Sequence, residues 1–156
     1  MLDSLAGKEK IRILTAIENH NKKTIDHNND PTTLTTIKLL RDADKLDIWR
    51  VVTEYYCNTQ GETNNTLQLD LPDAPEINPQ NYDDLLNEKM VDLVNLTTLN
   101  DFKLLQIGWI YDLNHQRSFQ ILNEKKYLDI IFQTLPDTKE IRTIQEKTNH
   151  YMQQNI

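Results

Sequence analysis

Apolar residues recur at helical spacing in the first half of the chain, and this pattern constrains the possible fold more than any other feature. Ile37, Leu40, Ile48 and Val51 lie on one side of an α-helix because the intervals between them are close to whole turns. Asp44 falls on the same stripe, seven residues after Ile37 and four before Ile48. The face that should be buried therefore carries a carboxylate, which needs an explanation.

Helical patterns of the same kind cover most of the remaining sequence. They are interrupted in residues 58–81, where Gly61 and several prolines exclude a long regular element. We therefore predict an all-α fold in a single domain, with core helices in 1–57, an irregular loop in 58–81 and a C-terminal helical extension in 82–156. The expected helices span residues 8–21, 33–56, 82–89, 99–113, 115–123, 127–134 and 137–154.

The first two expected helices should pack against each other. Ile11, Leu14 and Ile17 form an apolar stripe on the helix at 8–21, and the helix at 33–56 carries the stripe described above. Each stripe must be buried against another element. The helix at 33–56 is therefore expected at the centre of the fold.

Composition excludes several classes of partner. The formal net charge is −7, which argues against a nucleic-acid backbone as the main partner and suits a metal cation better. The single Cys57 cannot form an internal disulfide, and the N-terminal residues lack the apolar core of a signal peptide. The sequence contains no apolar run of about 18 residues that could span a membrane. We therefore expect a cytoplasmic protein without a membrane partner.

Two explanations of Asp44 follow from the residues alone. An isolated ionised carboxylate in a core is so costly that the group usually neutralises, pairs or binds a metal. In the structural explanation, Asp44 lies at the edge of the stripe and pairs with Arg41, Lys45 or a histidine from a neighbouring helix. In the functional explanation, it is a metal ligand.

The neighbouring carboxylates are easier to interpret. Asp42 lies four residues after Lys38 and three before Lys45, so we expect a solvated surface charge with ion-pair neighbours. Asp47 lies at the flank of the stripe, where it either supports Asp44 or pairs with Arg50.

His20 extends the apolar face of the first helix, because it follows Ile13 by seven residues and Ile17 by three. A histidine in this place more often caps the helix C-terminus or satisfies a core position than binds a ligand. A functional role requires Asp44 nearby. No role is assigned to His27, His115 and His150, and Cys57 is expected to be inert.

Two stretches carry a resemblance to a known family. The sequence "LLRDADKLDIWRVV", preceded by "AIENHNK", resembles the HD superfamily of metal-dependent phosphohydrolases. The segment "LLQIGWIYDLNHQRSFQILNEKKYLDIIF" is similar to the C-terminal helices of one bacterial branch of that superfamily, in which an aromatic-Asp-Leu-Asn turn precedes a Ser-Phe pair. The resemblance covers nearly the whole chain and is weakest in residues 58–81.

The resemblance implies a metal-dependent hydrolase site. In the family, an all-helical fold binds a metal through an early His, an adjacent His-Asp pair and a later Asp, and Asp44 corresponds to that later Asp. By the same resemblance, His20 is a pocket acid or base and Lys45 contacts the phosphate. Complete relatives hydrolyse a nucleotide or another small phosphate ester with water activated by a divalent metal, such as Mn, Mg, Fe, Ni or Zn.

The sequence departs from the family at the metal ligands. It contains no His-Asp dipeptide, so only one of the expected ligands is present, and a single carboxylate cannot define a catalytic metal geometry. The resemblance therefore predicts an HD-like helical bundle that is N-terminally truncated and inactive as this chain. We expect a homo-oligomer, or a separately encoded N-terminal partner, to cover the apolar surface left open.

Two other classes of function remain open at this point. One is a non-catalytic helical module that keeps the HD fold for ligand binding or oligomerisation. The other is an unrelated helical adaptor, which would be favoured if Asp44 were exposed to solvent.

Overall fold

The computed structural model describes residues 6–26, 28–58 and 69–156, and these residues form helices and connecting segments without any strand. The predicted all-α class is confirmed. The elements are α1 (Gly7–Asn19), α2 (Pro31–Asn58), α4 (Pro79–Leu86), η2 (Leu93–Asn95), α5 (Leu99–Gly108), η3 (Trp109–Asp112), α6 (Gln116–Glu124), α7 (Tyr127–Phe132) and α8 (Lys139–Asn155), where η marks a 3-10 helix.

The predicted helices are all present, with ends that differ by a few residues. The element expected at 99–113 is divided into α5 and the 3-10 turn η3. Residues 70–78 contain no helix, as predicted for this Pro-containing stretch, whereas 59–68, including Gly61, and His27 lie outside the described residues. None of the described helices has the length and apolar character needed to cross a bilayer.

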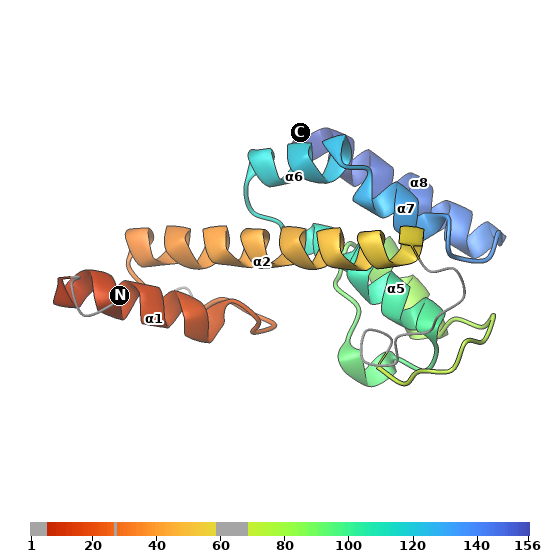
Figure 1. Ribbon diagram of the computed structural model, residues 1–156, viewed down its shortest axis with the longest axis horizontal. Helices are drawn as coiled ribbons and strands as arrows, with labels where there is room; N and C mark the ends of the chain where they lie inside the picture. The colour runs from red at the N-terminus through yellow and green to blue at the C-terminus, as the bar shows by residue number, and fades with distance from the viewer. Residues whose placement is uncertain (1–5, 27, 59–68) are drawn as a thin grey trace.

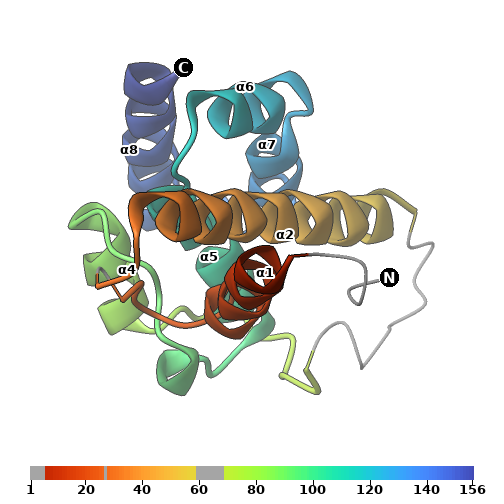
Figure 2. The same ribbon diagram turned by 90° about the vertical axis from the view of Figure 1, so that its left-hand side faces the viewer.

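Helix α2 occupies the centre of the molecule, as predicted. Figure 1 shows α1 along one side of α2 and the helices α6, α7 and α8 along the other. The view in Figure 2, turned by 90°, shows the same arrangement, with α5 beneath α2. The central helix therefore contacts both the N-terminal and the C-terminal elements.

The main core lies between α2 and the C-terminal helices. Trp49 of α2 is fully buried there, and its indole Nε1 donates a hydrogen bond to the carbonyl oxygen of Gln106, at 3.0 Å. Its ring lies 6.1 Å from that of Trp109. The other buried members of this core include Leu104, Ile107, Ile110, Leu122, Leu128, Ile131 and Ile144.

The buried face of α2 differs from the predicted stripe. Leu40, Asp44 and Ile48 are only half-buried, and Val51 is exposed. The buried line instead runs through Thr33, Ile37, Arg41, Lys45 and Trp49, at intervals of four residues. Sequence periodicity counts only apolar residues, and it therefore missed a face whose central positions are charged and satisfied by polar partners.

The apolar stripe of α1 was also expected to be buried, and this prediction was wrong. Ile11, Leu14 and Ile17 are 66%, 41% and 48% exposed. The buried residues of α1 are Ala16 and Asn19, and α1 packs on α2. A small alanine at this contact lets the two helices approach closely, which turns the larger apolar side chains away from α2.

Candidate functional site

The centre of α2 carries buried charges. Arg41, Asp42 and Lys45 are 2%, 1% and 7% exposed. Because burying an unpaired charge is costly, each must have partners. The partners come from the end of α1 and the residues after it, and from the segment that runs from the end of η3 into α6.

Asp112 binds both buried cations. Its Oδ2 atom accepts hydrogen bonds from Arg41 at 3.1 Å (Nε) and 2.7 Å (Nη2) and lies 2.6 Å from the Nζ atom of Lys45. One carboxylate therefore faces two positive charges. This cluster brings together residues that are about seventy positions apart in the sequence.

Arg41 also holds the C-terminal end of α1. Its Nη1 atom donates to the carbonyl oxygens of Asn19, His20 and Lys22, at 2.9, 3.2 and 2.6 Å. The last carbonyl groups of a helix lack intrahelical partners, and the guanidinium supplies donors for them. The segment that carries His20 is thereby fixed to α2.

Asp42 was expected to be a solvated surface charge, and this expectation was wrong. Its carboxylate accepts hydrogen bonds from the backbone N–H groups of Asn114 and His115, both at 3.0 Å, and from the Ser118 hydroxyl at 2.8 Å. The side chains of Asn114 (Nδ2, 3.0 Å) and His115 (Nδ1, 2.9 Å) also contact it. Because α6 begins at Gln116, Asp42 caps the N-terminus of that helix from a distant part of the chain.

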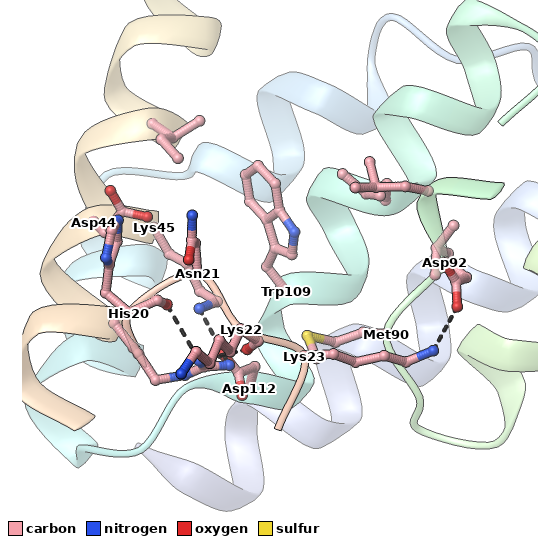
Figure 3. Close-up of a pocket in the computed structure, with 15 residues that line it drawn as sticks. His20, Asn21, Lys22, Lys23, Asp44, Lys45, Met90, Asp92, Trp109 and Asp112 are labelled. Carbon is pink, nitrogen blue, oxygen red and sulfur yellow. Dashed lines mark hydrogen bonds and ion pairs between the residues drawn. The ribbon is translucent and has the colours of Figure 1, made fainter. Parts of the chain in front are cut away.

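A pocket of about 290 Å³ lies beside this charged cluster. Residues 20–23 after α1, the central part of α2, residues 90–93, Leu105 of α5 and η3 surround it. Figure 3 shows His20, Asp44 and Lys45 at one end of the pocket, with Trp109 beside them. The structure therefore brings together all three site residues expected from the sequence.

Asp44 is half-buried and lines this pocket. No hydrogen bond or ion pair joins its carboxylate to another residue that the structure describes. The expected pairing with Arg41 or Lys45 is absent, since both cations pair with Asp112. Asp47 pairs with Arg50, at 2.8 Å, which is one of the two alternatives that the sequence left open.

His20 has the capping position that its location predicted. It follows the last residue of α1, and its Nδ1 atom lies 2.5 Å from the carbonyl oxygen of Ile17. This contact orients the ring at the end of the pocket.

The described residues around the pocket do not fit a metal centre. The part of the chain that the structure describes contains no group of three or more His, Cys, Asp and Glu side chains placed to bind one ion. Asp112 is engaged by two cations, and the His20 Nδ1 atom by a carbonyl group. Within this pocket, Asp44 lies among the cations Arg41 and Lys45, which disfavour a further positive charge.

A second ion pair lies at the edge of the pocket. The ammonium of Lys23 is 2.5 Å from Oδ2 of Asp92, and Figure 3 shows the Lys23 side chain extending past Met90 to reach it. This hydrogen bond raises the pKa of Lys23 and lowers the pKa of Asp92. Both side chains are solvent-accessible, so the pair is easily exchanged for water or for a ligand.

Sequence reasoning did not identify the residues that complete the site. Asp112, Lys23 and Trp109 were not candidates, although Asp112 belongs to the Tyr-Asp-Leu-Asn turn on which part of the resemblance rests. The available signal was that Arg41 and Lys45 lie at four-residue intervals between Ile37 and Trp49, on one side of the helix. They indicated a buried polar face that needed a carboxylate from elsewhere.

A comparison of the chain with models of known protein families, with curated proteins and with solved structures found no match. The function therefore has to be argued from the pocket itself.

Proposed function

We propose that this chain is an HD-hydrolase-like module that binds a small phosphorylated compound in the pocket beside α2 and does not hydrolyse it alone. The observation that carries the proposal is the meeting of His20, Asp44 and Lys45 at one pocket. In the sequence, His20 lies 24 residues before Asp44, and their proximity follows from the packing of α1 on α2.

The charges around the pocket favour an anionic ligand. Its lining includes the cations Lys22, Lys23, Arg41 and Lys45 and three aspartates. Over the whole lining, the cations outnumber the aspartates by one, so the pocket carries a small net positive charge. Lys45 retains ammonium N–H groups beyond the one directed at Asp112, and these are suitable donors to phosphate oxygens.

The apolar part of the pocket would hold the organic portion of the ligand. Ile48, Leu105 and Trp109 line the same pocket as the cations. An aromatic ring beside positive charges is a combination that recognises a planar group linked to a phosphate. Such a compound belongs to the class that the family resemblance implies.

The proposal that the chain is inactive alone rests on the ligand set. The sequence has no His-Asp dipeptide, and the residues around Asp44 do not fit a metal centre. Hydrolysis would therefore need ligands from outside these residues. A non-catalytic binding module that keeps an HD-like fold is the second candidate, and it shares the ligand-binding part of the proposal.

Titration calorimetry at low ionic strength, with inorganic phosphate and adenosine monophosphate as probes, tests the binding. We expect Lys45→Met to weaken binding of the nucleotide at least about tenfold, because a charge-assisted hydrogen bond contributes roughly 1.5–3 kcal/mol. The matched control is Lys139→Met, since Lys139 begins α8 and does not line the pocket. Absence of binding, or equal loss in both variants, would overturn the binding proposal.

A phosphatase assay with p-nitrophenyl phosphate tests the proposal that the chain does not hydrolyse phosphate esters alone. We expect no turnover by the chain, with or without Mn²⁺. Metal-dependent turnover that Asp44→Ala abolishes would show that the inactive assignment is wrong, while leaving the binding result unaffected.

A further inference from the structure

The aspartates that line the pocket beside α2 differ in their partners. Asp112 binds two buried cations, and Asp92 binds the ammonium of Lys23. Asp44 lines the same pocket, but its carboxylate forms no hydrogen bond or ion pair with any residue in the described part of the chain. Its oxygens are therefore acceptors that a ligand in this pocket can use.

A second acceptor lies at the same end of the pocket. The Nδ1 atom of His20 is 2.5 Å from the carbonyl oxygen of Ile17. Because a carbonyl oxygen only accepts, Nδ1 carries the proton, and in the neutral imidazole Nε2 is then an acceptor. Figure 3 shows His20 and Asp44 together at one end of the pocket. This end therefore offers acceptors on two side chains.

The surrounding charges decide which donor Asp44 favours. Arg41 and Lys45 line the same pocket, and they disfavour a further positive charge beside it. A phosphate dianion has no hydrogen to donate, and its charge repels the carboxylate. A hydroxyl group donates without charge, and the two oxygens of a carboxylate can accept from two hydroxyl groups on neighbouring carbon atoms.

We propose that Asp44 selects phosphate esters whose organic part carries two adjacent hydroxyl groups, as a sugar phosphate does, by accepting a hydrogen bond from each of them. The inference rests on the proposed binding of a phosphorylated compound and adds which compounds are preferred. Asp44 and Lys45 are neighbours in α2 and both line the pocket. One small molecule can therefore contact Lys45 with its phosphate and Asp44 with its hydroxyl groups.

The selection acts mainly against ligands that lack the hydroxyl groups. Asp44 is only half-buried, so water solvates its carboxylate while no ligand is bound. A ligand displaces this water, and an acceptor that is left without a donor weakens binding. Hydroxyl groups on the ligand replace the lost hydrogen bonds. The preference is therefore a difference between two affinities, and the poorer ligand sets most of it.

Titration calorimetry with two nucleotides that differ only in these hydroxyl groups tests the inference. Adenosine monophosphate has two adjacent hydroxyl groups on its ribose, and 2′,3′-dideoxyadenosine monophosphate has neither. We expect the wild-type protein to bind the dideoxy compound at least about tenfold more weakly. Asp44→Ala should weaken the binding of adenosine monophosphate at least about tenfold. The same variant should bind the dideoxy compound as well as the wild type or better, which also shows that the variant is folded.

Asp47→Ala is the matched control, because Asp47 belongs to the same helix, pairs with Arg50 and does not line the pocket. This variant should keep the preference of the wild type. Equal affinity of the wild type for the two nucleotides would overturn the role given to Asp44 and leave the binding proposal intact. A preference that persists in Asp44→Ala would also overturn it. If neither nucleotide binds the wild type, the inference and the binding proposal both fail.

Discussion

At the scale of single residues, two aspartates on α2 have opposite surroundings although they lie only two positions apart. Asp42 is fully buried and is surrounded by hydrogen-bond donors from the turn before α6. Asp44 is half-buried and faces the pocket without a described partner. Stability therefore depends on the first carboxylate, whereas the second lines the pocket of the proposed binding function.

The same chemical change at these two positions should have different effects. Asp42→Asn replaces one acceptor oxygen by an NH2 group that meets N–H and O–H donors, and we expect the free energy of unfolding to fall by about 2–3 kcal/mol. Asp44→Asn should change it by less than about 0.5 kcal/mol, as for other substitutions without such partners. Urea denaturation of both variants measures the difference. A large loss for Asp44→Asn would mean that Asp44 is a structural ion-pair member.

At the scale of elements, helix ends are held by side chains that are remote in the sequence. Arg41 satisfies the carbonyl groups at the end of α1, and Asp42 satisfies the N–H groups before α6. Asp101 has the equivalent role inside its own helix, where it forms a capping box with Thr98 at the start of α5. These polar contacts determine how the helices meet.

Loss of Arg41 should loosen α1. Arg41→Met removes the donors to three carbonyl groups and one of the two cations of Asp112, so we expect a loss of roughly 3 kcal/mol in the free energy of unfolding. Amide hydrogen exchange should become faster in residues 16–23. The control is Arg50→Met, whose exposed ion pairs with Asp47 and Glu54 contribute at most about 1 kcal/mol. Equal effects of the two variants would contradict the role given to Arg41.

The acid stability of the fold should depend on Asp101. Burial raises the pKa of its carboxyl, but hydrogen bonds from Thr97, Asn78 and Asn81 outweigh burial and hold the pKa below its ordinary value of 3.8. The carboxylate therefore contributes stability that is complete well above pH 3.8 and is lost as the pH falls from there through the folded-state pKa. Asp101→Asn should make the unfolding free energy less dependent on pH in this acidic range.

Chemical denaturation at several pH values below 5 measures this slope. Thr97→Val removes one donor, the Thr97 hydroxyl at 2.6 Å, and should give an intermediate slope. An unchanged slope in Asp101→Asn would show that other groups control acid unfolding.

At the scale of the whole molecule, α2 links the two parts of the chain on either side of residues 59–68. Trp49 belongs to the core built mainly by the C-terminal helices. Arg41 and Asp42 contact a turn more than seventy residues further along the chain. Polar contacts and apolar packing therefore join the N-terminal and C-terminal helices through one central element.

Divalent metal ions should not stabilise the chain. Stabilisation by a ligand follows RT ln(1 + [L]/Kd), and Asp44 with few other donors gives a weak Kd. We expect no measurable rise in the melting temperature with Mn²⁺ or Ni²⁺ relative to protein treated with a chelator. A rise that Asp44→Asn removes would mean that Asp44 belongs to a metal site.

The sequence alone was sufficient for the secondary structure and for part of the site. Apolar residues at helical spacing, interrupted by prolines, predicted the α-helices that the structure describes, because helix formation depends mainly on local periodicity and local signals for helix ends. The central position of α2 followed from its length and pattern. The quoted motifs also selected His20, Asp44 and Lys45, which the structure places at one pocket.

Only the tertiary structure decided which face of each helix is buried. Arg41, Asp42 and Lys45 are buried because Asp112, Asn114 and the carbonyl groups after α1 satisfy them. None of these partners is local in the sequence. An analysis of periodicity considers apolar residues only and does not detect a charged residue whose partner is distant in the sequence. It therefore predicted that Asp42 is solvated and that the apolar stripe of α1 is buried. The physical reason is that the free energy of burying a charge depends on its contacts, and contacts exist only in the folded chain.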